Sequence, residues 1–171
     1  MSMDKLWAPW RINYVQAKKA KGCIFCAAAK ATASKLRASA GVVFKTKHSM
    51  CILNIFPYNN GHLMIAPLAH AKNLSKLDDL ELLDLLRSVE KARLLLDKTL
   101  KPEGYNIGIN MSAVAGAGIP GHLHVHIVPR WKGDTNFMPI LGNTKIISQS
   151  LDQLHKLLRH AYTKTDPGIR K

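Results

Sequence analysis

Three histidines stand at every second position of the chain, at His122, His124 and His126, within a run that is otherwise apolar. Successive side chains of a β-strand point to opposite faces, so this spacing places all three imidazoles on one face. The apolar residues between them would face the other side and pack against a core. Histidine is not a favoured strand residue, and a row of solvated histidines on an edge strand is the weaker interpretation. The pattern therefore predicts a rigid strand that presents nitrogen ligands or nucleophiles.

The length and the cysteine content narrow the class of protein. A chain of 171 residues is long enough for one domain with a sizeable core and too short for two ordinary domains. No apolar run approaches the roughly 20 residues of a membrane span, and the N-terminus lacks the apolar core of a secretory signal. Three cysteines suit a reducing compartment better than a disulfide framework. We therefore expect a single-domain cytoplasmic protein with no membrane partner.

The formal net charge of +14 is large for this length and indicates polyanionic partners. Nucleotide phosphates and nucleic acid both fit this description. The basic residues do not form a compact block interleaved with aromatic residues, however, so we interpret most of them as solvated surface. The positive charge of these residues would also attract a nucleotide substrate, but this is a secondary effect. Nucleic-acid binding is not expected.

The hydropathy pattern predicts an α+β fold. Strands are predicted at residues 42–45, 50–53, 62–66, 105–110 and 122–128. A long leucine-rich helix is predicted to follow Ser75 as its N-cap and to stop at Pro102. These elements imply an antiparallel sheet with the long helix packed on it.

The remaining segments carry weaker patterns. A short helix is predicted within residues 18–40, and a C-terminal helix is predicted at residues 149–162. We expect an N-terminal arm at residues 1–22 and a loose tail at residues 164–171.

Cys23 and Cys26 form a Cys-x-x-Cys pair, whose spacing lets two thiolates share one zinc ion. A closed zinc site needs two more nitrogen or sulfur ligands, and the candidates are His48, His70 and His122. A redox pair is the competing interpretation of the same motif.

A loop of small residues comes directly before the three histidines and includes Gly116, Ala117 and Gly118. Small side chains let backbone N–H groups approach a phosphate and form an anion-binding nest, although tight turns need glycine equally. A neutral imidazole is a competent nucleophile toward a phosphorus atom, and the middle histidine, His124, is the natural candidate. The alternative is that His124 only packs or binds metal.

The histidine run resembles the signature of the histidine-triad (HIT) family of nucleotide hydrolases and transferases. Residues 54–67 resemble the ribose-binding half of that fold, and residues 110–118 resemble its phosphate loop. Residues 6–11 and 129–137 resemble flanks typical of the diadenosine polyphosphate branch. The likeness therefore extends from residue 6 to about residue 147, and it implies the HIT-like sheet.

This resemblance assigns roles to particular residues. It implies that His124 attacks the α-phosphorus to form an adenylyl-histidine, while His126 hydrogen-bonds phosphate oxygens. His62 would bond near the site and orient the triad. The residues implied to bind nucleotide and phosphate are Asn54, Ile52, Phe56, Met64, Asn110, Gly116, Ala117 and Gly118. The chain departs from the family pattern at Ser112, where glycine is common, and at Ala117 and Gly118, where other members carry Gln or Ser.

The resemblance also implies a metal site. HIT relatives with a Cys-x-x-Cys pair use the histidine after a Pro-x-x motif and the first triad histidine as further ligands. His70 follows Pro67 in that way, so the implied site is Cys23, Cys26, His70 and His122. With four protein ligands the zinc would be structural, because no open position remains for water. It would hold His124 in place.

The expected function is cleavage of dinucleoside polyphosphates such as diadenosine tetraphosphate, by hydrolysis or phosphorolysis. A nucleoside phosphoramidase is the alternative within the family, and a DNA-deadenylating enzyme is a third option. A nucleotide- or nucleic-acid-binding protein without turnover is the alternative outside enzymes. The family further implies a homodimer, and magnesium could accompany the substrate.

Overall fold

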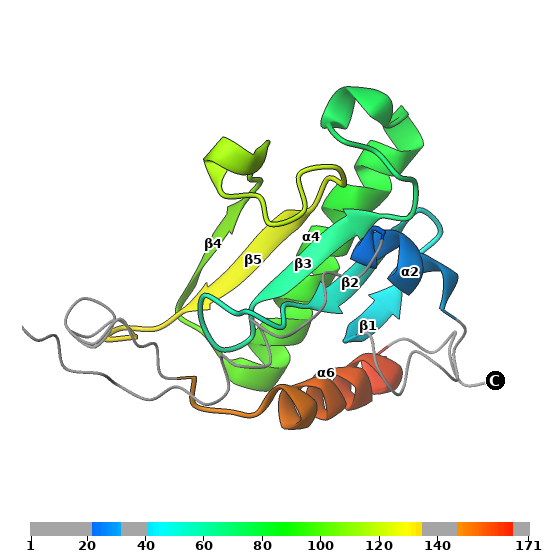
Figure 1. Ribbon diagram of the computed structural model, residues 1–171. Helices are drawn as coiled ribbons and strands as arrows, with labels where there is room; N and C mark the ends of the chain where they lie inside the picture. The colour runs from blue at the N-terminus through cyan, green and yellow to red at the C-terminus, as the bar shows by residue number, and fades with distance from the viewer. Residues whose placement is uncertain (1–21, 32–40, 135–146, 166–171) are drawn as a thin grey trace, which may run out of the picture.

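The computed structural model describes residues 22–31, 41–134 and 147–165, and it places five strands in one antiparallel sheet of order β1-β2-β3-β5-β4 (Figure 1). The strands are β1 (Val42–Lys45), β2 (Ser49–Leu53), β3 (Leu63–Pro67), β4 (Gly104–Gly108) and β5 (Val125–Arg130). The helices are α2 (Ile24–Lys30), α4 (Asp79–Leu100) and α6 (Leu151–Thr165), with 3₁₀ turns η1 (Leu74–Lys76) and η2 (Ala113–Ala115). The expected α+β fold is confirmed.

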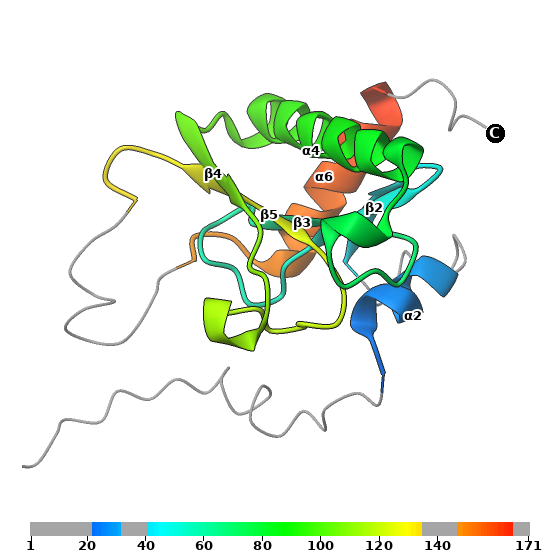
Figure 2. The same cartoon turned by 90° about the horizontal axis from the view of Figure 1, so that it is seen from above.

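Both faces of the sheet are covered. Helices α4 and α6 lie on one face, and the short helix α2 lies on the other (Figure 2). Alternate residues of β2 and β3 therefore enter two different cores. On β2, for example, Cys51 and Leu53 join the α4 side, whereas Met50 and Ile52 join the α2 side. Strands buried on both faces show continuous apolar runs, as β2 and β3 do here.

The strand that follows the histidine run begins later than the sequence predicts. Its ladder starts at Val125, so only His126 lies within β5, and His122 and His124 precede it. The backbone N–H of Leu123 bonds instead to the carbonyl of Ala71, outside the sheet ladder. Side-chain alternation nevertheless persists from residue 122 onward. The apolar residues of this stretch all pack on the α4 side: Leu123, Val125 and Ile127.

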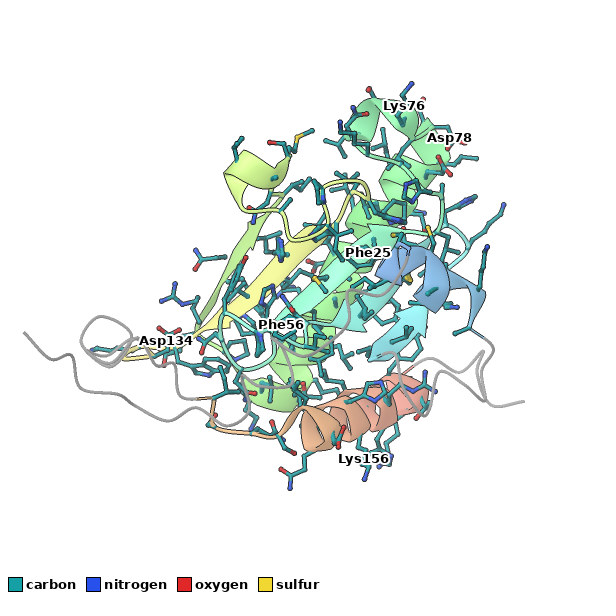
Figure 3. The ribbon with its side chains drawn as sticks, viewed as in Figure 1. Phe25, Phe56, Lys76, Asp78, Asp134 and Lys156 are labelled. Atoms are coloured by element: carbon teal, nitrogen blue, oxygen red, sulfur yellow. The ribbon has the colours of Figure 1, made fainter. Side chains whose placement is uncertain are left out.

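The N-cap of the long helix is Asp78, and the prediction of Ser75 is wrong. The Asp78 carboxylate accepts a hydrogen bond from the backbone N–H of Glu81, and the Glu81 side chain accepts one from the backbone N–H of Asp78. Ser75 lies in η1, where its hydroxyl donates to the side-chain oxygen of Asn73. Figure 3 shows Asp78 beside Lys76 at this helix start. The helix ends at Leu100, before Pro102 as expected.

The other bounds differ from the predictions by one to three residues. Strands predicted to begin at His62 and at Tyr105 begin at Leu63 and Gly104, and β4 ends at Gly108. The last helix runs from Leu151 to Thr165 in place of residues 149–162. Three stretches that carry predictions lie outside the described residues. They are residues 1–21 of the N-terminal arm, residues 135–137 and residues 166–171 of the tail. No helix in the described ranges is long and apolar enough to cross a membrane.

The cap at Asp78 gives a direct test of the helix start. We expect Asp78→Ala to lower the free energy of unfolding by about 1 kcal/mol, because the first turn then loses a partner for one backbone N–H. Ser75→Ala is the matched control, and it should change stability by no more than about 0.5 kcal/mol. Urea unfolding followed by circular dichroism measures both. Equal losses in the two variants would contradict the assignment.

Candidate active site and metal-ligand cluster

His124 is oriented by the carbonyl group of a neighbouring triad residue. Its Nδ1 lies 2.8 Å from the backbone oxygen of His122, and the residue is only 4% exposed. A carbonyl oxygen can only accept a hydrogen bond, so Nδ1 carries the proton and Nε2 carries the lone pair. The backbone thus selects the tautomer of the uncharged ring in which Nε2 is available as a nucleophile.

A chain of hydrogen bonds sets the tautomers of two further histidines. The backbone N–H of Tyr58 donates to His62 Nδ1 at 3.0 Å, so this nitrogen must be an acceptor. His62 Nε2 then carries the proton and donates to His126 Nδ1, 2.9 Å away. Consequently the remaining proton of His126 lies on Nε2. The structure therefore places His62 where the sequence analysis expected it, beside the triad.

His126 presents a donor that no described residue satisfies. Its Nε2 is buried and has no hydrogen-bond partner within the described chain. Burial, with a smaller contribution from the nearby His124, lowers the pKa of His126 to about 4. The imidazole is therefore neutral at physiological pH, and its Nε2–H is a donor for an oxyanion.

The loop between β2 and β3 holds His62 in place. Asn54 is buried, its amide nitrogen lies 3.2 Å from His62 Nδ1, and its oxygen accepts the backbone N–H of Phe56. Gly61 has φ +77°, and a Cβ there would lie 2.5 Å from a methyl group of Leu100. The turn before His62 thus requires glycine, and it packs on the end of α4.

The residues expected to contact the base differ in accessibility. Ile52 and Met64 are 6% and 7% exposed and pack in the core on the α2 side. Phe56 is 52% exposed in the β2–β3 loop (Figure 3). Met64 on β3 is the cross-strand partner of His126 on β5, so the residues expected to contact the base adjoin the triad.

The loop of small residues before the triad contains two residues with positive φ. Gly116 has φ +86°, and Ser112 has φ +77° with ψ 165°, a combination that only glycine adopts readily. The side chain of Asn110 approaches Gly116, because a Cβ there would lie 3.6 Å from the Asn110 amide nitrogen. The backbone N–H groups of Gly116 and Ala117 already donate within the loop, so neither is free for a phosphate without a rearrangement.

Two aromatic residues at the site were missed by the sequence analysis. The ring of Phe25, on α2, lies 5.0 Å from the ring of His122 and 4.9 Å from that of His124 (Figure 3). The ring of Tyr58 stacks on His126 and tilts over His62. Phe25 lies between the two cysteines of the Cys-x-x-Cys motif. Because the resemblance places this motif next to the first triad histidine, it could have indicated that Phe25 lies near the triad. No pattern in the sequence singles out Tyr58.

Cys23, Cys26, His70 and His122 come together as a candidate metal site. One potential ligand atom from each lies within 4.8 Å of all the others. A tetrahedral zinc ion with bonds of about 2.0–2.3 Å separates its ligand atoms by roughly 3.3–3.8 Å, so small shifts would close the site. His48, the further candidate, is not among these residues.

The hydrogen bonds around this cluster suit metal binding. His122 Nε2 lies 2.9 Å from the carbonyl oxygen of Pro67 and donates to it, which leaves the Nδ1 lone pair facing Cys23 Sγ at 3.3 Å. His70 Nδ1 lies 3.1 Å from Cys26 Sγ. Burial raises the pKa of the Cys26 thiol and lowers the pKa of His122. The cluster joins α2 to the start of the histidine run.

A buried row of oriented imidazoles thus lies on this five-stranded sheet, and the comparisons with known proteins show the family of the chain. The model of the HIT domain family matches residues 35–133, more than half of the chain. The chain belongs to the HIT family. The resemblance stated from the sequence is confirmed.

Two of the relatives that are similar in sequence are named for an activity on nucleotides. An AP-4-A phosphorylase of Mycobacterium tuberculosis (strain CDC 1551 / Oshkosh) is 37% identical over 161 residues, which cover 91% of this chain and 83% of that protein. A bis(5'-nucleosyl)-tetraphosphatase (asymmetrical) of Schizosaccharomyces pombe is 37% identical over 101 residues, which cover 59% of this chain and 55% of that protein.

Solved structures share the fold. A Zn-bound histidine triad family protein from Mycobacterium smegmatis has a TM-score of 0.66 at 24% identity, covering 86% of this chain and 97% of that one. A hypothetical histidine triad nucleotide-binding protein from Sulfolobus tokodaii has a TM-score of 0.66 at 26% identity, covering 86% of this chain and 96% of that one.

Proposed function

We propose that this protein cleaves dinucleoside polyphosphates such as diadenosine tetraphosphate through an adenylyl-histidine intermediate on His124. The observation that carries the proposal is that two ring nitrogens with complementary roles lie on one face of the site. His124 Nε2 has a lone pair, and His126 Nε2–H is a buried donor without a partner in the described chain. The names of the two relatives support the same substrate class.

In the first step, His124 Nε2 attacks the phosphorus atom that bears the adenosine. A P–N bond forms, the P–O bond to the remaining chain breaks, and ATP leaves. His126 Nε2–H donates to a non-bridging oxygen of the transferred group, whose negative charge it stabilises better than water could in this buried place. In the second step an acceptor oxygen attacks the same phosphorus, and the P–N bond breaks to restore neutral His124.

The other predicted residues bind the nucleotide in this proposal. The side-chain oxygen of Asn54 accepts one hydrogen bond from Phe56, and its second lone pair accepts one from a ribose hydroxyl. Ile52, Phe56 and Met64 contact the base. Asn110 and the loop at Gly116, Ala117 and Gly118 contact the phosphate chain. The loop must rearrange to do so, because the Gly116 and Ala117 amides are engaged within it.

We propose orthophosphate as the acceptor in the second step, because the relative that covers 91% of this chain is named a phosphorylase. Water is the alternative acceptor, as in the asymmetrical tetraphosphatase that matches a shorter part of the chain. Nucleoside phosphoramidates are the alternative substrates.

Incubation with diadenosine tetraphosphate tests the reaction. Phosphorolysis gives ADP and ATP only when orthophosphate is present, whereas hydrolysis gives AMP and ATP without it, and chromatography separates these products. His124→Asn should lower the rate at least about a thousandfold, because it removes the nucleophile. His160→Asn, an exposed histidine on α6, is the control and should keep the rate. Wild-type protein that forms no product with either acceptor contradicts the proposal.

We further propose that the candidate metal site binds a structural zinc ion. The site offers two thiolates and two imidazoles, the ligand set that zinc prefers in closed tetrahedral sites. With the ion bound, these residues would fasten α2 to the segment before His124. The Zn-bound relative of known structure supports this proposal.

Metal analysis tests the zinc site. Wild-type protein should carry about one zinc ion per chain, and Cys23→Ser should carry less than about a fifth of that, because one thiolate ligand is lost. Cys51→Ala is the matched control, since this buried cysteine lies in the core on the α4 side. Inductively coupled plasma mass spectrometry gives the ratio. Unchanged zinc in Cys23→Ser would contradict the site.

We also propose a homodimer that forms at the β4 edge of the sheet. The two edge strands differ, because His155 and Arg159 of α6 donate to the carbonyls of Val42 and Val43 on β1. No residue of β4 is buried, and Ile107 on it is 46% exposed. Exposed leucines also occur along α4, at Leu80, Leu83, Leu86 and Leu94. Among the described strands β4 pairs only with β5, and an open edge strand on a molecule with exposed apolar residues favours pairing with a second copy.

Light scattering during size-exclusion chromatography tests this interface. We expect a mass near twice the 19.0 kDa of the chain for the wild type. Ile107→Glu should shift the protein toward the monomer, because it buries a charge at the proposed contact. Leu157→Glu, on α6 at the opposite edge, is the control and should stay dimeric. A monomeric wild type at micromolar concentration excludes the dimer.

A further inference from the structure

We propose that Tyr58 is a positioning residue whose ring keeps water from the His62–His126 pair and so holds His126 with its Nε2–H directed at the substrate phosphate. The catalytic consequence of this role rests on the function proposed above. The positioning itself is a property of the protein without substrate, and it can be measured there.

The ring of Tyr58 covers both imidazoles at once. Its centroid lies 5.6 Å from that of His126 with 29° between the ring planes, and 4.6 Å from that of His62 with 40° between the planes. Tyr58 is 49% exposed, so one part of the residue faces solvent while the ring packs on the pair. The ring is therefore the layer between solvent and the His62–His126 hydrogen bond on that side.

This layer matters because the direction of the hydrogen bond decides what His126 offers. If His62 Nε2 donates, His126 Nε2 carries a proton and can bond a phosphate oxygen. If water separates the two rings, His126 Nδ1 can donate to that water, and His126 Nε2 then has a lone pair, which repels the same oxygen. Water at the pair would offer partners to both arrangements, whereas an aromatic face offers no comparable hydrogen bond. Exclusion of water thus favours the tautomer that the loop sets through His62 Nδ1.

The backbone and the side chain of Tyr58 make separable contributions. Its backbone N–H donates to His62 Nδ1, and this hydrogen bond remains possible when the side chain is replaced. The amide nitrogen of Asn54 also approaches His62 Nδ1, so this nitrogen keeps its donors in every variant. In the described ranges the hydrogen bond of Tyr58 is made by its backbone N–H, and its hydroxyl makes none. The proposal therefore assigns the effect to the ring alone, and phenylalanine should replace it.

The surroundings of His126 contain few other charges that could produce the same effect. The titratable groups that face it are His62, His124 and the phenol of Tyr58 itself. Its cross-strand neighbours are uncharged, Met64 on β3 and Gly108 on β4. Desolvation is the main cause of the low pKa of His126, which is consistent with a covering ring.

The test is nitrogen-15 NMR of the histidine side chains in the substrate-free protein, with wild type, Tyr58→Phe and Tyr58→Ala. Wild type and Tyr58→Phe should show His126 as the Nε2–H tautomer. Tyr58→Ala should show a mixture of tautomers, with the pKa of His126 at least about one unit higher, because water reaches the imidazole. Ile55→Ala, an exposed apolar residue of the same loop, is the matched control and should leave His126 unchanged.

Kinetics then link the tautomer to turnover. Tyr58→Ala should lower kcat roughly ten- to a hundredfold while KM changes less than about threefold, and Tyr58→Phe should restore kcat. If Tyr58→Ala does not fold, Tyr58→Gln, which keeps side-chain bulk but brings polar groups to the pair, takes its place. An unchanged His126 tautomer in the folded variant overturns the proposal. This outcome is distinct from failure of the proposed function, in which wild type itself cleaves no dinucleoside polyphosphate.

Discussion

Burying a row of imidazoles against a sheet imposes one constraint on this molecule: each ring nitrogen needs a partner, because an unpaired buried polar group is costly. The backbone supplies three of these partners. The carbonyl of His122 meets His124, the carbonyl of Pro67 meets His122, and the N–H of Tyr58 meets His62. Since each backbone group is only a donor or only an acceptor, every such bond selects a tautomer. The fold therefore sets which nitrogen carries a proton and which carries a lone pair.

His122 connects two functions through one residue. Its ring joins the candidate metal site, and its carbonyl oxygen orients His124, so a movement of His122 would also shift the ring of His124. Phe25 reinforces this link, because it lies between the two cysteines in sequence and its ring contacts both His122 and His124. The short helix α2 also buries Phe25 and Ala28 in the core on its side of the sheet, so it joins that core to the site.

Much of the site was predictable because its chemistry is local in the sequence. A two-residue period indicates which histidines share a face, and the Cys-x-x-Cys spacing indicates a ligand pair, although only the family resemblance pointed to His70 and His122 as their partners. The contribution of Tyr58 was not predictable, since a ring contact across the β2–β3 loop leaves no periodic pattern. The helix start was missed for another reason: Ser75 and Asp78 are both good N-caps, and only the reciprocal bond with Glu81 separates them. The late start of β5 depends on the contact of Leu123 with Ala71, which is set by tertiary packing.

Two unfavourable features remain on the side of the sheet that carries the triad. His126 Nε2 is a buried donor without a partner in the described chain, which costs on the order of 1–3 kcal/mol. Ser112 adopts a backbone conformation suited to glycine in the loop before the triad, which costs a similar amount. A phosphate oxygen would satisfy the first, and contact with a phosphate chain could rearrange the strained loop. If a phosphate chain binds here as proposed, it would meet both features, and a residue that removed either cost should stabilise the protein while weakening its hold on that substrate.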